Sequence, residues 1–448
     1  MSEARWIFFA ALSTSFIGPF MGSAVNLAVP AIGAELGAPV ESLGWIVTAY
    51  LLGSAVVLLP VGRMADIVGR KRVYTCGVAL FLLGNLAATL VTSLELLIAC
   101  RLFQGVATAM IFGTGMAMIV SVHAPSERGK VIGYSAAATY IGLSLGPMLG
   151  GFVTETVGWR GIFYLTGAGL VFSLFAVSRV KTEWYGARGE AFDWRGALLY
   201  MGASGLVLYG CSAVTENAAA KFLLAAGAVL LVCFFRSQAR CAAPLVDMKL
   251  LKENTVFAMS SLAAMINYSA TFAIGFILSL YLQLIRGLDA SAAGLLLLIQ
   301  PALMAIFSPM AGALSDRLQP RVVASAGMAL DAVGLLLFAF LRADTPLWLV
   351  GANVALIGLG FALFSSPNNN AIMGAVEPKY YGIAASILSA MRLIGQAMSM
   401  AVVTAVLAHY GAAAHEEMLA GFNAAFGIFA ALCGGGILAS LARGKRCS

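Results

Sequence analysis

Long apolar stretches separated by short polar segments run the length of the 448-residue chain. A helix needs about 20 apolar residues to cross a bilayer, and its backbone must be hydrogen-bonded within the segment itself. The eighth apolar stretch is the shortest, so twelve or thirteen spans remain alternatives to fourteen. We predict fourteen membrane-spanning helices at residues 6–30, 43–62, 73–93, 96–121, 131–153, 161–179, 196–215, 217–235, 256–283, 291–314, 322–341, 347–371, 382–408 and 421–442.

The composition supports this all-α, polytopic membrane fold. The chain is 61% hydrophobic and 10% charged, with a mean hydropathy of +0.92, which leaves too little polar surface to coat a soluble globule. The first apolar run lacks a clear basic region before it, so we expect no cleaved signal peptide. Seven cysteines without a CxxC pair and three scattered histidines predict neither a disulfide framework nor a metal site.

The positions of the lysines and arginines predict the orientation of the chain, because basic residues stay on the cytoplasmic side during insertion. With a cytoplasmic amino terminus and fourteen spans, 21 of the 27 basic residues lie in cytoplasmic segments. Both termini are then cytoplasmic, and the net charge of +7 indicates membrane topology and attraction to anionic lipid, with no sign of nucleic-acid binding. The six exceptions are Arg160, Lys221, Arg286 and Arg342 in exterior loops, and Arg101 and Arg392 within spans.

An internal repeat organises the chain. After the second and the tenth spans, a glycine is followed four residues later by an aspartate and then by basic residues. Repeated halves are typical of transporters, with the substrate site between them near mid-membrane. We predict an amino-terminal six-helix bundle at 1–181, cytoplasmic linkers with two inserted helices at 182–254, and a carboxyl-terminal bundle at 255–448. The repeated loop residues are Gly62, Asp66, Gly69 and Arg70 in the first half and Gly312, Asp316 and Arg321 in the second.

Four local signatures, at 62–72, 101–105, 142–151 and 24–30, make the chain resemble the major facilitator superfamily, specifically its fourteen-helix drug:proton antiporter branch. The resemblance covers essentially the whole chain. It implies two six-helix bundles joined by a two-helix insertion, and proton-coupled export of small lipophilic compounds from the cell through the plasma membrane. The proton gradient would supply the energy, and no cofactor would be bound.

The first and third signatures have physical interpretations of their own. Asp66 is suited to cap a neighbouring helix and to pair with a base, which would latch the cytoplasmic ends in one state; alternatively, the basic residues there are only insertion anchors. Glycines recurring every four residues in span five predict a close helix contact, which we interpret as a hinge and a seal between the halves. The residues of this antiporter helix are Gly142, Gly146 and Gly150, with Pro147 as the kink.

Three charged residues inside spans are candidates for proton coupling. Arg101 is costly in the membrane, by about 2.5–3.5 kcal/mol near a helix centre, and should face an interior or snorkel outward. The resemblance implies a role for it in proton exchange. Asp331 is the carboxylate placed deepest in any span, so it needs a bound proton, a basic partner or access to water. Arg392 is the basic residue deep in the second half and could pair with Asp331.

Neutral polar residues inside the apolar bundle suggest a cavity of broad specificity, with nineteen methionines as soft wall material. Each alone is more often an interhelical hydrogen bond than a ligand contact. The chain has Met21 where many fourteen-helix antiporters carry an aspartate, so a neutral or anionic substrate becomes more plausible than a polycation. The cavity candidates are Asn26, Gln104, Asn267, Tyr268, Gln300, Asn353, Asn369 and Gln396.

Other classes of function fit less well. A primary pump would need a GxxxxGK[ST] loop and a nucleotide-binding domain, neither of which the sequence contains. A membrane enzyme would need clustered nucleophiles, bases or metal ligands, so we expect no enzymatic activity. A receptor or scaffold would have no use for embedded charges. An importer or uniporter remains open, because fold does not decide the direction of transport. We expect a monomer, since one chain holds both halves of the site.

Overall fold

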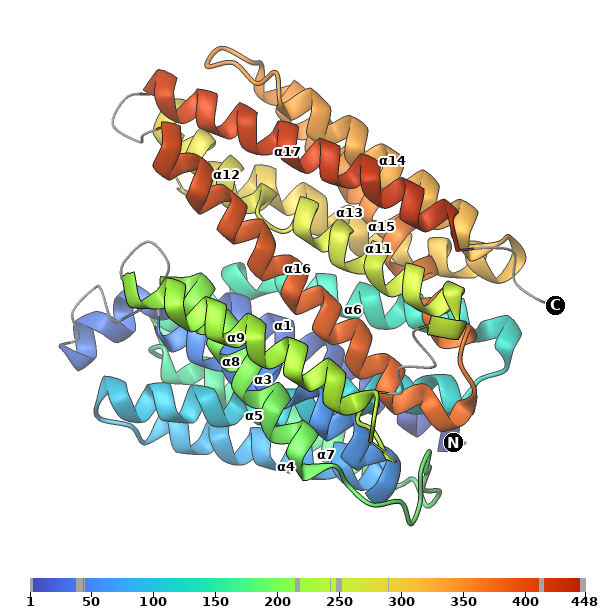
Figure 1. The fold of residues 1–448 in the computed structure, drawn as a ribbon. Helices are drawn as coiled ribbons and strands as arrows, with labels where there is room; N and C mark the ends of the chain where they lie inside the picture. Colours follow the sequence, from blue (N-terminus) through green and yellow to red (C-terminus); the bar gives the residue numbers. More distant parts are fainter. Residues whose placement is uncertain are drawn as a thin grey trace. The chain divides into compact units, whose positions relative to one another are not determined.

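The structure, a computed structural model, describes residues 3–37, 43, 45–213, 218–241, 243–246, 252–288, 290–410 and 415–443. Most of these residues are helical, and none of them lies in a strand (Figure 1). The helices of the first half are α1 (Glu3–Leu36), α3 (Trp45–Val68), α4 (Arg70–Thr89), α5 (Leu94–Val122), α6 (Arg128–Thr156) and α7 (Arg160–Ser178), followed by the inserted α8 (Trp194–Ala213) and α9 (Ala218–Gln238). Those of the second half are α11 (Thr255–Thr271), α12 (Ile274–Leu280), α13 (Ala290–Arg317), α14 (Pro320–Phe338), α15 (Leu347–Gly374), α16 (Tyr381–Tyr410) and α17 (His415–Leu441).

Thirteen spans within the described residues are long and apolar enough to cross a membrane, which confirms a multi-pass helical fold. The weakest predicted span, the eighth, is among them as α9. The remaining one of the fourteen is α8, which ends beside residues outside the described part, so its crossing stays a prediction. The ninth span is interrupted at Phe272 and Ala273, where the backbone N–H of Ala273 donates to Ser399 Oγ at 3.0 Å.

Packing within the two halves shows the repeat that the sequence predicts. In the first half, the main contacts join α3 with α5, α4 with α5, α1 with α7 and α4 with α7. In the second half, they join α13 with α15, α14 with α15, α11 with α17 and α14 with α17. When the spans are numbered from one to six within each half, both halves pair span two with four, three with four, one with six, and three with six. The packing therefore confirms the internal repeat. The inserted α8 packs on α9 and on α3.

The chain forms two compact units whose limits differ slightly from the predicted bundles. Unit 1 comprises 1–124, 138–248 and 376–390, and unit 2 comprises 125–137, 249–375 and 391–448. The beginning of α6 therefore belongs to unit 2 and the beginning of α16 to unit 1. The physical reason is that a carboxylate from the repeated loops holds each of these helix beginnings, as described next.

Candidate functional site

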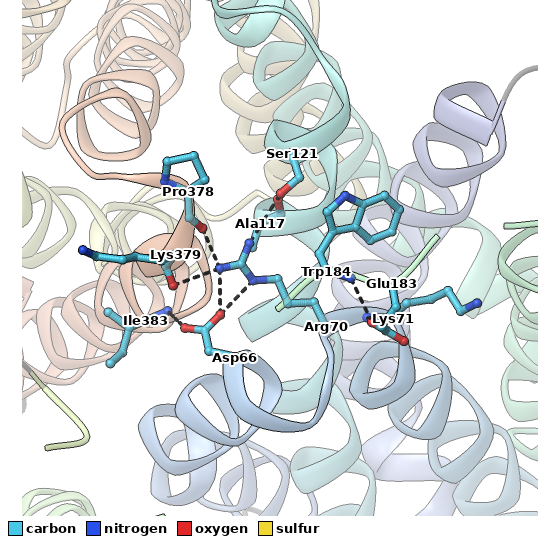
Figure 2. Close-up of polar contacts among 10 residues, drawn as sticks. All are labelled: Asp66, Arg70, Lys71, Ala117, Ser121, Glu183, Trp184, Pro378, Lys379 and Ile383. Carbon is cyan, nitrogen blue, oxygen red and sulfur yellow. Dashed lines mark hydrogen bonds and ion pairs between the residues drawn. The ribbon is translucent and has the colours of Figure 1, made fainter. Parts of the chain in front are cut away.

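The first repeated loop is built around a buried ion pair (Figure 2). Asp66 lies in the last turn of α3 and Arg70 opens α4, joined by Gly69 with a φ of 122°, a conformation that favours glycine. Arg70 Nε donates to Asp66 Oδ1 at 2.8 Å, and both side chains are at most 2% exposed. Because a buried pair is costly unless its remaining hydrogen-bonding groups are satisfied, the additional partners matter.

Those additional partners come from the beginning of α16. Asp66 Oδ2 accepts the backbone N–H of Ile383 at 3.3 Å, as an acidic residue does at a helix amino terminus. Arg70 Nη2 donates to the carbonyls of Pro378 (2.8 Å) and Lys379 (3.2 Å) (Figure 2). The predicted capping role of Asp66 is therefore present in the structure, and the capped segment comes from the second half of the sequence.

Gly62 and Gly382 allow this close approach. A Cβ added at Gly62 would lie 1.9 Å from Ser386 Oγ, and one at Gly382 would lie 2.4 Å from Asp66 Oδ1. Neither position leaves room for a side chain. The glycine that opens the repeated loop is therefore required by the contact between α3 and α16.

The linker after α7 supports the loop, which the sequence did not indicate. The carbonyl of Asp66 accepts the N–H groups of Gly186 and Ala187, both at 2.9 Å, and the N–H of Arg70 donates to Trp184 O. Glu183 Oε1 accepts the N–H of Lys71 at 2.7 Å, so it caps the beginning of α4. The sequence predicts only a polar cytoplasmic linker here, because nothing in its composition distinguishes a segment that packs on the loop from one that is surrounded by solvent.

The second repeated loop makes an equivalent contact within unit 2. Asp316, near the end of α13, accepts the N–H of Gly129 (2.9 Å) and of Lys130 (3.1 Å) at the beginning of α6. Asn370 Nδ2 also donates to it at 3.1 Å. Gly312 again allows the approach, since a Cβ there would lie 2.1 Å from the Gly129 carbonyl oxygen.

The basic ends of the two loops differ. Arg70 joins the carboxylate of its loop, whereas Arg321 donates from Nε to Gln319 Oε1 at 2.8 Å and forms no ion pair with Asp316. The gating role predicted for Arg321 as the basic end of the second loop stays a prediction. Arg321 follows Pro320, which begins α14, whereas Arg70 is itself the first residue of α4.

Arg101, on α5, lies in a buried hydrogen-bond network within unit 1. Its Nε donates to the Ile46 carbonyl at 3.0 Å, its Nη1 to Gln104 Oε1 at 2.9 Å, and its Cζ lies 4.4 Å from the centre of the Tyr50 ring. The residue is 1% exposed, so it does not snorkel outward. Among the described residues no carboxylate pairs with it, and hydrogen bonds and an aromatic face stabilise its charge instead.

The network continues from Gln104 across four helices. Gln104 Nε2 donates to Asn85 Oδ1 at 3.1 Å, and Asn85 Nδ2 donates to Thr166 Oγ1 at 2.8 Å. Thr166 Oγ1 lies 4.0 Å from the sulfur of Met21. The chain of contacts thus ends at the position where related antiporters are expected to carry an aspartate.

Asp331, on α14, has a very different environment in unit 2. It is completely buried, and Asn267 Nδ2 of α11 donates to its Oδ2 at 2.9 Å. Its Oδ1 has no hydrogen-bond partner, and neither has Asn267 Oδ1. A Cβ on Gly360 would lie 2.5 Å from Asp331 Oδ1, so the backbone of α15 closes over the carboxyl group. Asp331 forms no ion pair with Arg392 in the described part of the chain, so the proposed structural pair was wrong.

The glycine face of α6 packs against α1. Added Cβ atoms at Gly142, Gly146 and Gly150 would meet Phe16 O at 2.4 Å, Ser23 Oγ at 1.8 Å and Ala24 Cβ at 2.6 Å. The close helix contact is therefore confirmed. The contacting residues of α6 and α1 all belong to unit 1, and the predicted hinge and seal between the halves stay a prediction. Pro147 is exposed.

The predicted cavity residues divide into two groups. Gln104, Asn267 and Asn353 are buried and engaged between helices; Asn353 Nδ2, for example, donates to Gly334 O at 2.8 Å. The others keep some exposure, and Tyr268 packs edge-on against Phe361. The remaining candidates for contact with a substrate are therefore Asn26, Tyr268, Gln300, Asn369 and Gln396.

The two helical units share the same packing, and each has a loop whose carboxylate caps the beginning of another helix. This architecture defines the class as a membrane transporter built from two repeated halves. The chain belongs to the Major Facilitator Superfamily, whose sequence profile matches residues 8–239 and 260–446. It is 29% identical to the riboflavin transporter RibZ of Clostridioides difficile (89% of this chain, 87% of that protein) and 32% identical to the multidrug resistance protein Stp of Mycobacterium tuberculosis (88% and 74%). The human organic anion transporter MFSD10 (TETRAN) has the same fold, with a TM-score of 0.67 at 15% identity over 98% of this chain and 97% of that one.

Proposed function

We propose that this transporter exports small lipophilic compounds in exchange for protons and that Asp331 carries the proton. The observation behind the proposal is the environment of this carboxyl group: complete burial, one hydrogen bond from a neutral amide, and an oxygen without a partner. A charged carboxylate is expensive there, and a protonated one costs much less. Coupling follows if the charged and neutral forms favour different conformations of the transporter.

The proposed membrane is the plasma membrane, with both termini in the cytoplasm. The distribution of basic residues supports this orientation, because 21 of 27 then lie on one side. The repeated halves within one chain support a monomer as the transporting unit.

The test is transport into liposomes. The purified protein is reconstituted, a pH gradient is imposed, and internal pH is followed together with uptake of lipophilic cations, neutral drugs and organic anions. Proton flux that depends on substrate supports antiport. Substrate flux without proton movement would indicate a uniporter, and Asp331 would then be only a structural residue.

For the substrate, we propose a neutral or anionic compound. No carboxylate lies in the Arg101 network among the described residues, and Met21 occupies the end of that network. The names of the relatives, a riboflavin transporter and a multidrug resistance protein, support a small organic substrate.

The variant Met21→Asp tests the substrate class. It places an acid beside Thr166, and we expect it to gain transport of lipophilic cations relative to wild type. The matched control is Met21→Asn, which adds polarity without charge. If both variants leave the ratio of cation to anion transport unchanged, Met21 does not determine the substrate class.

For the loops, we propose that Asp66 and Asp316 act as latches that hold the beginnings of α16 and α6 in one state of the transport cycle. We expect Asp66→Asn to weaken the contact with Arg70, release this end of α16, and slow the cycle. The measurement is the labelling rate of single cysteines introduced on each face. Arg72→Gln is the control, because the Arg72 side chain is 67% exposed. Equal labelling in Asp66→Asn and Arg72→Gln would remove the latch assignment.

A further inference from the structure

Arg443 is a buried cation without a partner in unit 2. It follows α17 directly and is 1% exposed, yet its Nε, Nη1 and Nη2 atoms have no hydrogen-bond partner. No ion pair involves it in the part of the chain that the structure describes. Burial lowers the pKa of Arg443 to about 10, so the group is still charged at neutral pH. A buried charge without a partner is strongly unfavourable, so an anionic partner would stabilise this group.

The register of the helices places Arg443 near the beginning of α14. Ser440 Oγ and Ser325 Oγ are 2.7 Å apart, and Cys433 Sγ contacts Met328 O at 3.6 Å, so α17 and α14 run antiparallel. Arg443 lies about one turn beyond Ser440, toward the first turn of α14. That turn begins with Pro320 and has no side-chain cap. The N–H of Val322 in this turn already donates to the Gln319 carbonyl at 2.9 Å. Other N–H groups at a helix amino terminus attract anions.

The charges around this end are mostly basic. Arg317 and Lys252 are exposed, and Arg321 is half-buried and hydrogen-bonded to Gln319. Glu253 is exposed next to Lys252, and the carboxylate of Asp316 is already occupied by the beginning of α6. Basic pockets between membrane helices on the cytoplasmic side bind the head groups of anionic lipids.

We propose that Arg443 and the uncapped beginning of α14 form a binding site for a phosphate group. The planar guanidinium offers several N–H donors in a geometry that matches two phosphate oxygens, and all three of its nitrogens are buried without a hydrogen-bond partner. The predicted orientation places this site at the inner leaflet, where the head group of an anionic phospholipid is one source of phosphate and soluble phosphate is the other.

The test is the melting temperature of the purified full-length protein in a neutral detergent. Phosphatidylglycerol, phosphatidylcholine or inorganic phosphate is added in increasing amounts. A ligand that binds only the folded protein raises Tm in a saturable way. We expect phosphatidylglycerol to do so and phosphatidylcholine not to. If inorganic phosphate gives the same saturable rise, the source is soluble phosphate. If neither anion raises Tm above phosphatidylcholine, the proposal is wrong.

Two variants assign the effect to the residue. Arg443→Met should lose most of the phosphatidylglycerol shift, whereas Arg317→Met, which changes an exposed basic residue at the end of α13, should keep it. Retention of the shift in Arg443→Met would overturn the proposal, and so would an equal loss in both variants, which indicates only a diffuse basic surface. If Arg443→Met does not fold, Arg443→Lys replaces it. Because lysine keeps the charge without the planar fork, the titration midpoint should move to higher lipid concentration, and an unchanged midpoint would also overturn the site.

Discussion

Arg101 and Asp331 are both buried charged residues in membrane helices, one in each unit, and their environments are opposite. The guanidinium of Arg101 has a carbonyl, an amide oxygen and an aromatic ring as partners. Asp331 has a single amide donor and an oxygen without a partner. A well-solvated group in a fixed network stabilises one structure, while a poorly solvated one is easily switched by a proton. The comparison supports the proposal that Asp331 carries the proton, and it favours a structural role for Arg101.

The largest expected effect on stability is that of Arg101→Met. The substitution leaves the Ile46 carbonyl and Gln104 Oε1 without their donor inside the bundle. We expect the free energy of unfolding to fall by about 2–4 kcal/mol, since each buried unsatisfied group costs about 1–3 kcal/mol. Thermal unfolding in detergent measures this. A variant as stable as wild type would show that the network does not stabilise unit 1.

A smaller effect is expected for Asn85→Leu, in the middle of the same network. It removes the hydrogen bonds to Gln104 and Thr166 but leaves Arg101 and its carbonyl partner in place. We expect a loss of about 1–2 kcal/mol, as two neutral hydrogen bonds contribute about 0.5–1.5 kcal/mol each. The same unfolding assay applies. A loss as large as that of Arg101→Met would mean that the network acts as one unit.

The smallest effect on stability is expected for Asp331→Asn. The amide has nearly the shape of the carboxyl group and no charge, so only the bond from Asn267 is disturbed. We expect a change within about 1 kcal/mol in either direction. A large loss of stability, comparable to that of Arg101→Met, would show that Asp331 is structural and would reverse the comparison.

The sequence predicted much of the architecture because its signals are local. Continuous apolar runs indicated the helices, and the spacing of Gly62 and Asp66, repeated at Gly312 and Asp316, indicated the two loops. The place of Asp331 inside an apolar run indicated an interior position, whereas for Arg101 outward snorkelling was an open alternative. In each case the cost of the bilayer environment made the prediction possible.

What the sequence could not predict depends on contacts between distant segments. The linker residues Glu183 and Trp184 support the first loop although they lie about 110 residues after it in the sequence. An example is the 2.7 Å hydrogen bond from Lys71 N to Glu183 Oε1. The spacing of Gly142, Gly146 and Gly150 predicts a close helix neighbour but not that this neighbour is α1. The sequence also could not show that Asp331 on α14 accepts a hydrogen bond from Asn267 on α11 and forms no pair with Arg392.

The most direct test of proton coupling through Asp331 compares two transport modes of Asp331→Asn in liposomes. Counterflow exchanges substrate for substrate and needs no net proton movement, whereas accumulation driven by a pH gradient does. If Asp331 carries the proton, the variant should retain counterflow close to the wild-type rate and lose gradient-driven accumulation together with substrate-dependent proton flux. Gradient-driven accumulation at the wild-type rate would contradict this role and place the proton elsewhere in the transporter.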